Sequence, residues 1–414
     1  MNKKMSAYRI YLIFAGGTAL LFSLFFTVSQ IYRIEVAGLN PLQLVLVGTV
    51  LEAACFLFEI PTGVVADIYS RKLSVIIGLI LIGGGFLLEG SFPIYIAILA
   101  SQVLWGVGHT FLSGANEAWI ADEVGERELD RLFLKGAQIG QVFSLIGILL
   151  STAVGAVMIN LPMLVSGFLF IMLALFLMAF MPETKFTPMP KNERNTWSNM
   201  IKTFSEGIYS IKEKSILIVI LFITLLHGLF SEGIDRLWNA HFIENIKFPT
   251  AVNLKPVIWF GIINAVAMIL SIIVVEFIKR KMNKTGRLEK VWLLLGINGV
   301  LVGAIIIFGL AGNFAFGFAT YLTLYIMRTT NGPLYRAWLN QNIKAKVRAT
   351  VLSTYGQIDA FGQIIGGPII GYIAVKYSIS VAIVIAGIIL SPVILLYLFS
   401  AKQTKRVTTE EVSS

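Results

Sequence analysis

The chain has 414 residues, of which 57% are hydrophobic and only 14% are charged. A soluble protein carries about 25% charged residues, so this composition argues against an ordinary soluble enzyme and favours a polytopic membrane protein. The net charge is +10, and the single cysteine, Cys55, argues against disulfides and cysteine-based metal sites.

Twelve apolar stretches follow one another along the chain, and a membrane-spanning helix needs about 20 such residues. The sequence therefore predicts an all-α polytopic membrane protein. The first residues run directly into an apolar stretch without a small-residue cleavage site, so we expect the first helix to be retained. In chain order, the expected spans are 10–31, 42–65, 73–91, 94–120, 136–160, 162–181, 216–240, 256–278, 291–311, 314–337, 349–374 and 379–400.

A polar stretch rich in Pro, Lys and Asn divides the twelve spans into six and six. We expect an N-terminal six-helix bundle at 1–181, a cytoplasmic linker at 182–215, a C-terminal six-helix bundle at 216–400 and a cytoplasmic tail at 401–414. The two halves share short patterns at equal spacing, which favours two pseudo-symmetric bundles with a substrate site between them. These patterns are Asp67-x-x-x-Arg71-Lys72 with Glu276-x-x-x-Arg280-Lys281, and Gly140-Gln141…Gly155 with Gly356-Gln357…Gly371.

The basic residues gather on one side of the predicted membrane. With the N-terminus inside, 27 of the 33 lysines and arginines fall in inner segments and five in outer ones, with Arg328 left within a span. Because inner loops carry the excess of Lys and Arg, both termini are predicted to be cytoplasmic. The same distribution assigns the basic charge to topology and anionic lipid and not to nucleic acid. The five outer residues are Arg33, Arg236, Lys247, Lys255 and Lys376.

Several charged side chains fall inside predicted spans, where each costs at least about 2.5 kcal/mol. Glu52 and Glu59 are two helical turns apart on one face of the second span, and Glu89 lies near the outer end of the third. A buried carboxyl can hold a proton that competes with a cationic substrate. We therefore assign proton coupling or the substrate cavity to Glu52, Glu59, Glu89, Arg328 and Asp359, with structural pinning of the helices as the alternative.

Arg328 and Asp359 are expected at similar depth, so they could form a buried pair, either structural or lining the cavity. Near the outer end of the seventh span, a second charged cluster could form an outer gate or a solvated helix end; it consists of Glu232, Asp235 and Arg236. His227 lies well inside the same span and could be a titrating relay or a satisfied core residue.

The segment after the second span carries a recognisable motif. Gly63-x-x-x-Asp67-x-x-Ser70-Arg71-Lys72 resembles the loop motif between helices two and three of the major facilitator superfamily, although that motif usually has glycine in place of Ser70. The resemblance extends over nearly the whole chain and implies the major facilitator fold. It also implies a cytoplasmic gate at this motif, with Glu117 as a further candidate; otherwise Arg71 and Lys72 only fix the topology.

Three longer strings, FEIPTGVVAD, SGANEAWIADEVGE and SEGIDRLWNAHF, resemble a bacterial branch that includes the clostridial-type tetracycline efflux proteins. This resemblance implies a drug–proton antiporter of the bacterial cytoplasmic membrane that exports tetracycline as a metal chelate. Two features depart from drug antiporters: Gln102 stands where a helix-four arginine is common, and the fifth span lacks a proline. The pattern Gly362-x-x-x-Gly366-Gly367-Pro368 occurs in the eleventh span instead.

Other classes of protein find less support in the sequence. No GxxxxGK[ST] or HExxH motif occurs, which argues against an ATP-driven pump and a zinc enzyme. We expect no enzymatic activity, no cofactor and no protein-bound metal, with the proton as coupling ion and a monomer as the working unit. The alternatives within transporters are export of another drug, such as a macrolide, and carriage of a metabolite.

Overall fold

The computed structural model describes residues 5–188, 205, 209, 211–212, 214–249, 254–282, 286–343 and 347–413. Most of the predicted linker at 182–215 lies outside the described residues. The described part is built from helices, joined by short turns and one isolated bridge between Lys247 and Asn313. The helices are α1 (Ala7–Glu35), α2 (Pro41–Ile68), α3 (Arg71–Ser91), α4 (Tyr95–Leu112), α5 (Ala115–Val124), α6 (Glu126–Gly155), α7 (Leu161–Phe180), α9 (Ser215–Glu244), α10 (Pro256–Met282), α11 (Arg287–Gly309), α12 (Phe314–Asn342), α13 (Arg348–Lys376), α14 (Ile379–Leu390) and α15 (Pro392–Ser413).

These helices confirm the predicted all-α architecture with twelve helical segments of membrane-spanning length. Within the described residues, eleven segments are long and apolar enough to cross a membrane, with α4–α5 and α14–α15 each forming one. The twelfth is α12, which has sufficient length but carries Arg328, Arg336 and several amide side chains. Polar residues in a helix of this length indicate that the helix faces water or other protein segments at these positions and not lipid.

The breaks between helices follow from local chemistry. Gly114 separates α4 from α5 with φ of 71°, and Gly125 separates α5 from α6 with φ of 81°. Residues with a side chain rarely adopt this left-handed region, whereas glycine does so without steric cost. Ser70 caps α3 by accepting a hydrogen bond from the Leu73 amide at 2.9 Å, which fixes where the new helix begins.

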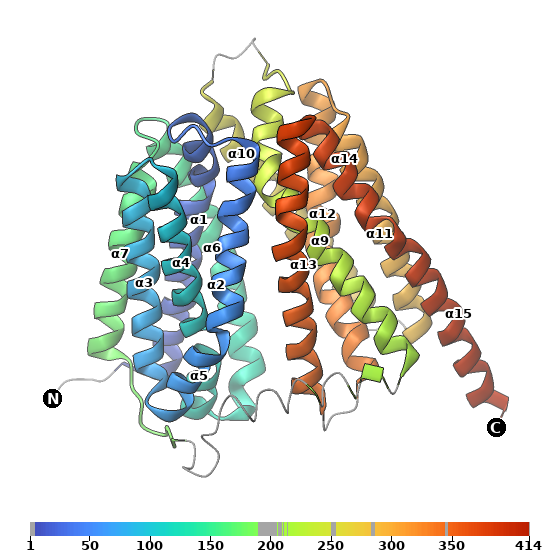
Figure 1. Cartoon of the computed structure of the whole chain (residues 1–414). Helices are drawn as coiled ribbons and strands as arrows, with labels where there is room; N and C mark the ends of the chain where they lie inside the picture. Colours follow the sequence, from blue (N-terminus) through green and yellow to red (C-terminus); the bar gives the residue numbers. More distant parts are fainter. Residues whose placement is uncertain are drawn as a thin grey trace. The chain divides into compact units, whose positions relative to one another are not determined.

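The chain forms two compact units, and two helices contribute to both. One unit comprises Met1–Leu39, Val50–Thr196 and Leu254–Ala265, and the other comprises Asn40–Thr49, Trp197–Asn253 and Val266–Ser414. The division therefore falls inside α2 and inside α10. In the first unit, α1 packs against α6 and α7, while α3 packs between α4 and α7 (Figure 1).

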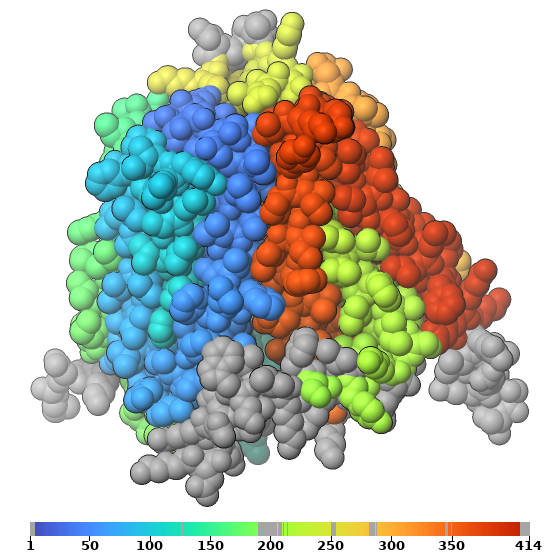
Figure 2. All heavy atoms as spheres, viewed as in Figure 1, coloured from blue at the N-terminus to red at the C-terminus, as the bar shows by residue number. Residues whose placement is uncertain are grey.

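The second unit is organised around α9 and α11. Helix α9 packs against α13 and α14, and α11 packs against α12, α14 and α15. Figure 2 shows the yellow-green atoms of α9 beside those of α13 on the face in view. A Cβ added at Gly362 would lie 2.8 Å from the Leu225 carbonyl oxygen and 3.0 Å from Gly228 Cα. Small residues thus allow α9 and α13 to approach closely.

Candidate functional site

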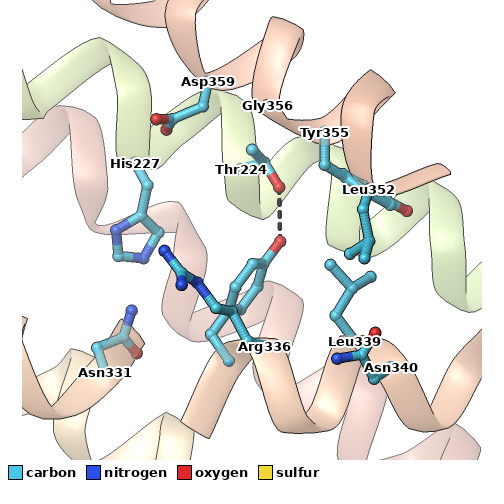
Figure 3. A pocket seen from close by; sticks show the side chains of 11 residues that line it. Thr224, His227, Asn331, Arg336, Leu339, Asn340, Leu352, Tyr355, Gly356 and Asp359 are labelled. Atoms are coloured by element: carbon cyan, nitrogen blue, oxygen red, sulfur yellow. Dashed lines mark hydrogen bonds between the residues drawn. The ribbon is translucent and has the colours of Figure 1, made fainter. Parts of the chain in front are cut away.

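A cavity of about 510 Å³ lies in the second unit, between α9, α12 and α13 (Figure 3). Ligand pockets occupy about 300–1,000 Å³ and combine apolar walls with a few placed polar groups, so this cavity has the size and the mixed lining of a small-molecule site. Its lining residues are Thr224, His227, Asn331, Tyr335, Arg336, Leu339, Asn340, Leu352, Tyr355, Gly356 and Asp359.

Asp359 provides the carboxylate of the cavity, while its assignment to substrate binding or proton coupling stays a prediction. Its Oδ2 atom accepts a hydrogen bond from Gln363 Nε2 at 3.0 Å, one helical turn further along α13. A Cβ at Gly228 would overlap the Asp359 carbonyl oxygen, so only glycine permits this approach of α9 to the Asp359 backbone. The close packing therefore holds the Asp359 carboxylate at a defined place on the cavity wall.

Two tyrosine hydroxyls tie the walls of the cavity together. Tyr335 of α12 hydrogen-bonds to the Thr224 hydroxyl at 2.5 Å and donates to the Ile220 carbonyl at 3.2 Å. Tyr355 of α13 donates to the Leu217 carbonyl at 2.7 Å. Both contacts reach backbone or hydroxyl groups of α9, so the three lining helices are connected by direct hydrogen bonds and not only by apolar packing.

A chain of three polar side chains forms another part of the wall. His227 Nε2 lies 3.0 Å from Asn298 Oδ1, and Asn298 Nδ2 donates to Asn331 Oδ1 at 2.9 Å. Asn298 itself is fully buried in α11, whereas His227 and Asn331 line the cavity. His227 is thus held by a hydrogen bond and also lines the cavity, while its role as a titrating relay stays a prediction.

Arg336 supplies positive charge to the same cavity. Its side chain is exposed, and within the described part of the chain it has no ion-pair partner. The cavity therefore presents one carboxylate and one guanidinium, from Asp359 on α13 and Arg336 on α12, that are not paired with each other. Such a wall can bind a molecule that carries both a cationic or metal-bound group and an oxyanion.

The predicted pair of Arg328 and Asp359 is wrong. Arg328 instead forms a two-pronged ion pair with Asp235, in which Nη2 lies 2.7 Å from Oδ2 and Nη1 contacts Oδ1. The two side chains are 32% and 44% exposed, so the protein encloses this pair only in part. Asp235 follows Ser231 by one helical turn on α9. At this position its side chain faces Arg328 of α12. The depth in the membrane that the sequence predicts for each residue could not identify which carboxylate faces Arg328.

The other members of the proposed outer gate form their own pair. Arg236 Nε donates to Glu232 Oε1 at 2.6 Å along α9, and Glu232 is only 2% exposed. A Cβ added at Gly48 of α2 would overlap the Glu232 carboxylate, so Gly48 allows α2 to pack directly on this pair. Arg236 therefore lies inside a helix and is largely buried, and counting it as an outer-loop residue was wrong.

Glu89 does not line the cavity of the second unit. It is fully buried in the first unit, where Arg33 Nε and Nη2 donate to its two oxygens at 2.7 and 3.1 Å. Ser101 Oγ and Gln102 Nε2 donate to the same carboxylate at 2.7 and 2.9 Å. Arg33 is therefore a buried helix residue and not an outer-loop residue as predicted. Gln102, which stands in the place of the helix-four arginine, serves as a neutral donor beside the guanidinium of Arg33.

The two glutamates of α2 have different surroundings. Glu52 is half-buried, and Glu59 is exposed and accepts a hydrogen bond from Ser113 Oγ at 3.2 Å. Both belong to the first unit, whereas the cavity described above belongs to the second. Their assignment to coupling stays a prediction.

The loop motif after α2 is bound to α5 and to the end of α7. Arg71 contacts Asp122 and the Ala118 carbonyl, the latter at 2.6 Å. Glu183 accepts hydrogen bonds from the Ser70 hydroxyl at 2.6 Å and from the Lys72 amide at 2.9 Å. Four of the predicted gate residues take no part in these side-chain contacts: Asp67 and Glu117 are exposed, Gly63 has open space around its Cα, and Lys72 contributes its backbone.

Several residues of these sites were missed by sequence reasoning. Asp122 and Glu183 lie in polar segments at helix ends, where charged residues are common, so their type carries little information. Arg336 lies close to the inner end of its expected span at 314–337, where a basic residue commonly fixes topology. The best available signal was the spacing of polar residues along α12, where Asn331, Tyr335 and Arg336 recur at helical intervals.

Comparisons with known proteins agree on one family. The model of the Major Facilitator Superfamily matches residues 7–358. The chain is 24% identical over 361 residues to the "Uncharacterized MFS-type transporter YxaM" of Bacillus subtilis (strain 168), which covers 86% of either chain. Among solved structures, the nucleoside transporter NupG matches with a TM-score of 0.75 at 12% identity, covering 95% of this chain and 98% of NupG.

The peptide transporter POT in complex with sulfate matches with a TM-score of 0.75 at 14% identity, covering 97% of this chain and 94% of POT. At such low identity, these structural matches establish the fold and carry no information about the substrate of this chain.

Proposed function

Because the chain belongs to the Major Facilitator Superfamily, and is therefore a multi-pass membrane transporter and not an enzyme, we propose that it is a proton-coupled drug exporter. It works by alternating access in the bacterial cytoplasmic membrane, with both termini in the cytoplasm, as a monomer. The favoured substrate is tetracycline as a chelate with a divalent metal. The metal belongs to the cargo, and the protein needs no cofactor.

The observation that carries this proposal is the carboxylate of Asp359 on the wall of the cavity of about 510 Å³, together with the guanidinium of Arg336, which has no ion-pair partner among the described residues. A carboxylate in a substrate cavity can hold a proton or a cationic group, but not both. Competition between proton and substrate for the same group is sufficient to couple their movements. Arg336 gives the cavity a binding group for the oxyanion of a metal chelate.

Three strings of the chain support tetracycline over other substrates, because they resemble the clostridial-type tetracycline efflux proteins. In this proposal Glu52 and Glu59 serve proton movement in the first unit. The contacts of Arg71 with Asp122 form part of a gate on the cytoplasmic side, and the Glu232–Arg236 pair belongs to an outer gate. The alternatives are export of another drug, such as a macrolide, and carriage of a metabolite.

Inverted membrane vesicles with an acidic interior test the proposal directly. Uptake of radiolabelled tetracycline with Mg²⁺ is measured with and without a protonophore, alongside vesicles that lack the protein. We expect uptake that depends on the protein and collapses with the pH gradient. If folded protein gives no gradient-dependent uptake, tetracycline–proton exchange is excluded, and the same vesicles then compare a radiolabelled macrolide with a nucleoside.

A further inference from the structure

In one set of hydrogen bonds in the second unit, the positions of the atoms determine which groups donate and which accept. Asn298 of α11 donates from Nδ2 to the Leu294 carbonyl oxygen at 2.8 Å and to Asn331 Oδ1 at 2.9 Å. Its Oδ1 atom lies 3.0 Å from His227 Nε2. The Asn298 side chain is fully buried and joins α9, α11 and α12. The same set therefore connects two residues that line the cavity, His227 and Asn331.

The Leu294 carbonyl decides how the Asn298 amide is turned. A carbonyl oxygen can only accept, so the Asn298 atom at 2.8 Å must be the nitrogen. The opposite assignment would place two acceptor oxygens in contact inside the protein, where neither finds water. Asn298 Oδ1 must then face His227, and because this oxygen can only accept, His227 Nε2 must carry the proton.

The orientation of the Asn298 amide has two consequences for the groups on the cavity wall. Neutral His227, with its proton on Nε2, has a lone pair on Nδ1, and among the described residues Nδ1 has no hydrogen-bond partner. Asn331 uses its oxygen to accept from Asn298, so its Nδ2 group remains as a donor. The wall therefore offers an acceptor from His227 and a donor from Asn331, both oriented by the same buried amide.

We propose that Asn298 is a positioning residue that orients His227 and Asn331 as an acceptor–donor pair for recognising an amide-like group of the substrate. A primary carboxamide fits this pair because it donates from nitrogen to His227 Nδ1 and accepts on oxygen from Asn331 Nδ2. A carboxylate, which has no donor, would leave the His227 lone pair facing an oxygen. The inference rests on the proposed function, because it takes the cavity to be where the transported molecule binds.

The protein contains its own control for the histidine. His241 Nε2 lies 2.9 Å from the Phe308 carbonyl oxygen, which also requires the proton on Nε2. Its Nδ1 atom is buried without a hydrogen-bond partner in the described structure, and His241 is not part of the cavity wall. The chain has three histidines in all, so their ring nitrogens can be resolved and assigned one by one.

Nitrogen NMR of ¹⁵N-histidine-labelled protein in nanodiscs tests the positioning role without any transport measurement. At alkaline pH, where free imidazole is neutral, we expect wild-type His227 to show the Nε2–H form. Asn298→Leu removes the amide and should give His227 a mixture of both neutral forms, while His241 stays unchanged. A His227 proton on Nδ1, or a His227 signal that Asn298→Leu leaves unaltered, contradicts the proposal.

Benzamide and benzonitrile then test recognition with matched probes that do not depend on tetracycline. Both are flat aromatic molecules, but the nitrile has no N–H donor. We expect benzamide to shift the His227 Nδ1 signal with an apparent affinity about tenfold above that of benzonitrile. Asn331→Leu should weaken the response to both probes, because each offers an acceptor to Asn331 Nδ2, and His241 should not respond to either probe.

Equal responses to the two probes, or no response to either, overturn the amide-recognition proposal. This outcome is separate from failure of the exporter proposal, which the vesicle measurement decides. If benzamide is preferred but tetracycline is not transported, the recognition site stands and the substrate assignment falls. If tetracycline is transported without any preference for benzamide, the reverse holds.

Discussion

Two charged pairs in helices of membrane-spanning length have opposite surroundings. In the first unit, Arg33 and Glu89 are 0% exposed, and Ser101 and Gln102 complete the hydrogen bonds of the carboxylate. In the second unit, Arg328 and Asp235 are 32% and 44% exposed. In the first pair both carboxylate oxygens accept hydrogen bonds and both side chains are fully enclosed, whereas the protein leaves the second pair partly exposed.

A charged residue inside a span must therefore have a structural or a functional role, but its presence in the sequence does not say which. Taking two charges out of water costs several kcal/mol per ion, and only a fully hydrogen-bonded partner offsets this cost. The Arg33–Glu89 site meets that condition, so we expect it to hold α1, α3 and α4 together. The charges of the second unit, with Asp359 and Arg336 on a cavity wall, leave binding capacity for another molecule.

The largest effect is expected from Arg33→Leu. This change leaves Glu89 buried without a cation, and removing one partner of a buried pair costs about 3–5 kcal/mol. Chemical unfolding in detergent should show the loss, together with a low yield of monodisperse protein. The double change of Arg33 and Glu89 to leucine should recover most of the stability. If the single variant is as stable as wild type, the pair does not hold the fold.

A smaller effect, on substrate binding, is expected from Arg336→Gln. A hydrogen bond to a charged group contributes about 1.5–3 kcal/mol, so the KM for tetracycline chelate should rise by about tenfold or more. Arg336→Lys keeps the charge without the fork of donors and should retain part of the affinity. Because Arg336 is exposed, unfolding should be unchanged in both variants. A KM equal to wild type removes Arg336 from the binding site.

The half-exposed pair of the second unit should couple by only about 1 kcal/mol, because solvent screens it. A double-mutant cycle with Asp235→Asn and Arg328→Gln measures this coupling through unfolding free energies. The matched cycle with Asp359→Asn and Arg328→Gln should give a value near zero. A stronger coupling of Arg328 to Asp359 than to Asp235 would contradict the ion pair of the structure.

The smallest effect on stability is expected from Asp67→Asn, because the Asp67 side chain is exposed. Surface changes of this kind stay within about 0.5 kcal/mol. If Asp67 belongs to the gate, the turnover of tetracycline should fall more than its binding affinity does. Asp122→Asn provides the comparison, since it removes the contact with Arg71, in which Asp67 takes no part. Equal losses of turnover and affinity in Asp67→Asn count against gating.

The sequence predicted much of the fold, because helices of membrane-spanning length require long apolar stretches that are visible in one dimension. It also singled out Asp359, since a charged residue in an apolar span must be accounted for, but it left a buried pair and a cavity wall as alternatives. The sequence did not show which charged residues form ion pairs with each other. Arg328 could face Asp235 or Asp359 at similar depth, and only the rotation and packing of α9, α12 and α13 decide between them.

Other parts of the site had no distinct signal in the sequence. Arg33 and Arg336 lie near span ends, where basic residues commonly fix topology, so their roles as a buried partner and a cavity residue depend on how the helices extend. Asn298 is one polar residue in an apolar helix, and its importance comes from neighbours on two other helices. Pairwise contacts across helices, and not residue types, separate these roles.

The most direct test of the contrast measures transport per folded molecule in proteoliposomes for Glu89→Gln and Asp359→Asn. Glu89→Gln should reduce the amount of folded protein, while the molecules that fold should carry tetracycline along the proton gradient at nearly the wild-type rate. Asp359→Asn should fold in wild-type amounts and lose about tenfold or more of the gradient-driven flux. A structural role for Glu89 and a transport role for Asp359 are contradicted if folded Glu89→Gln protein is inactive while Asp359→Asn transports normally.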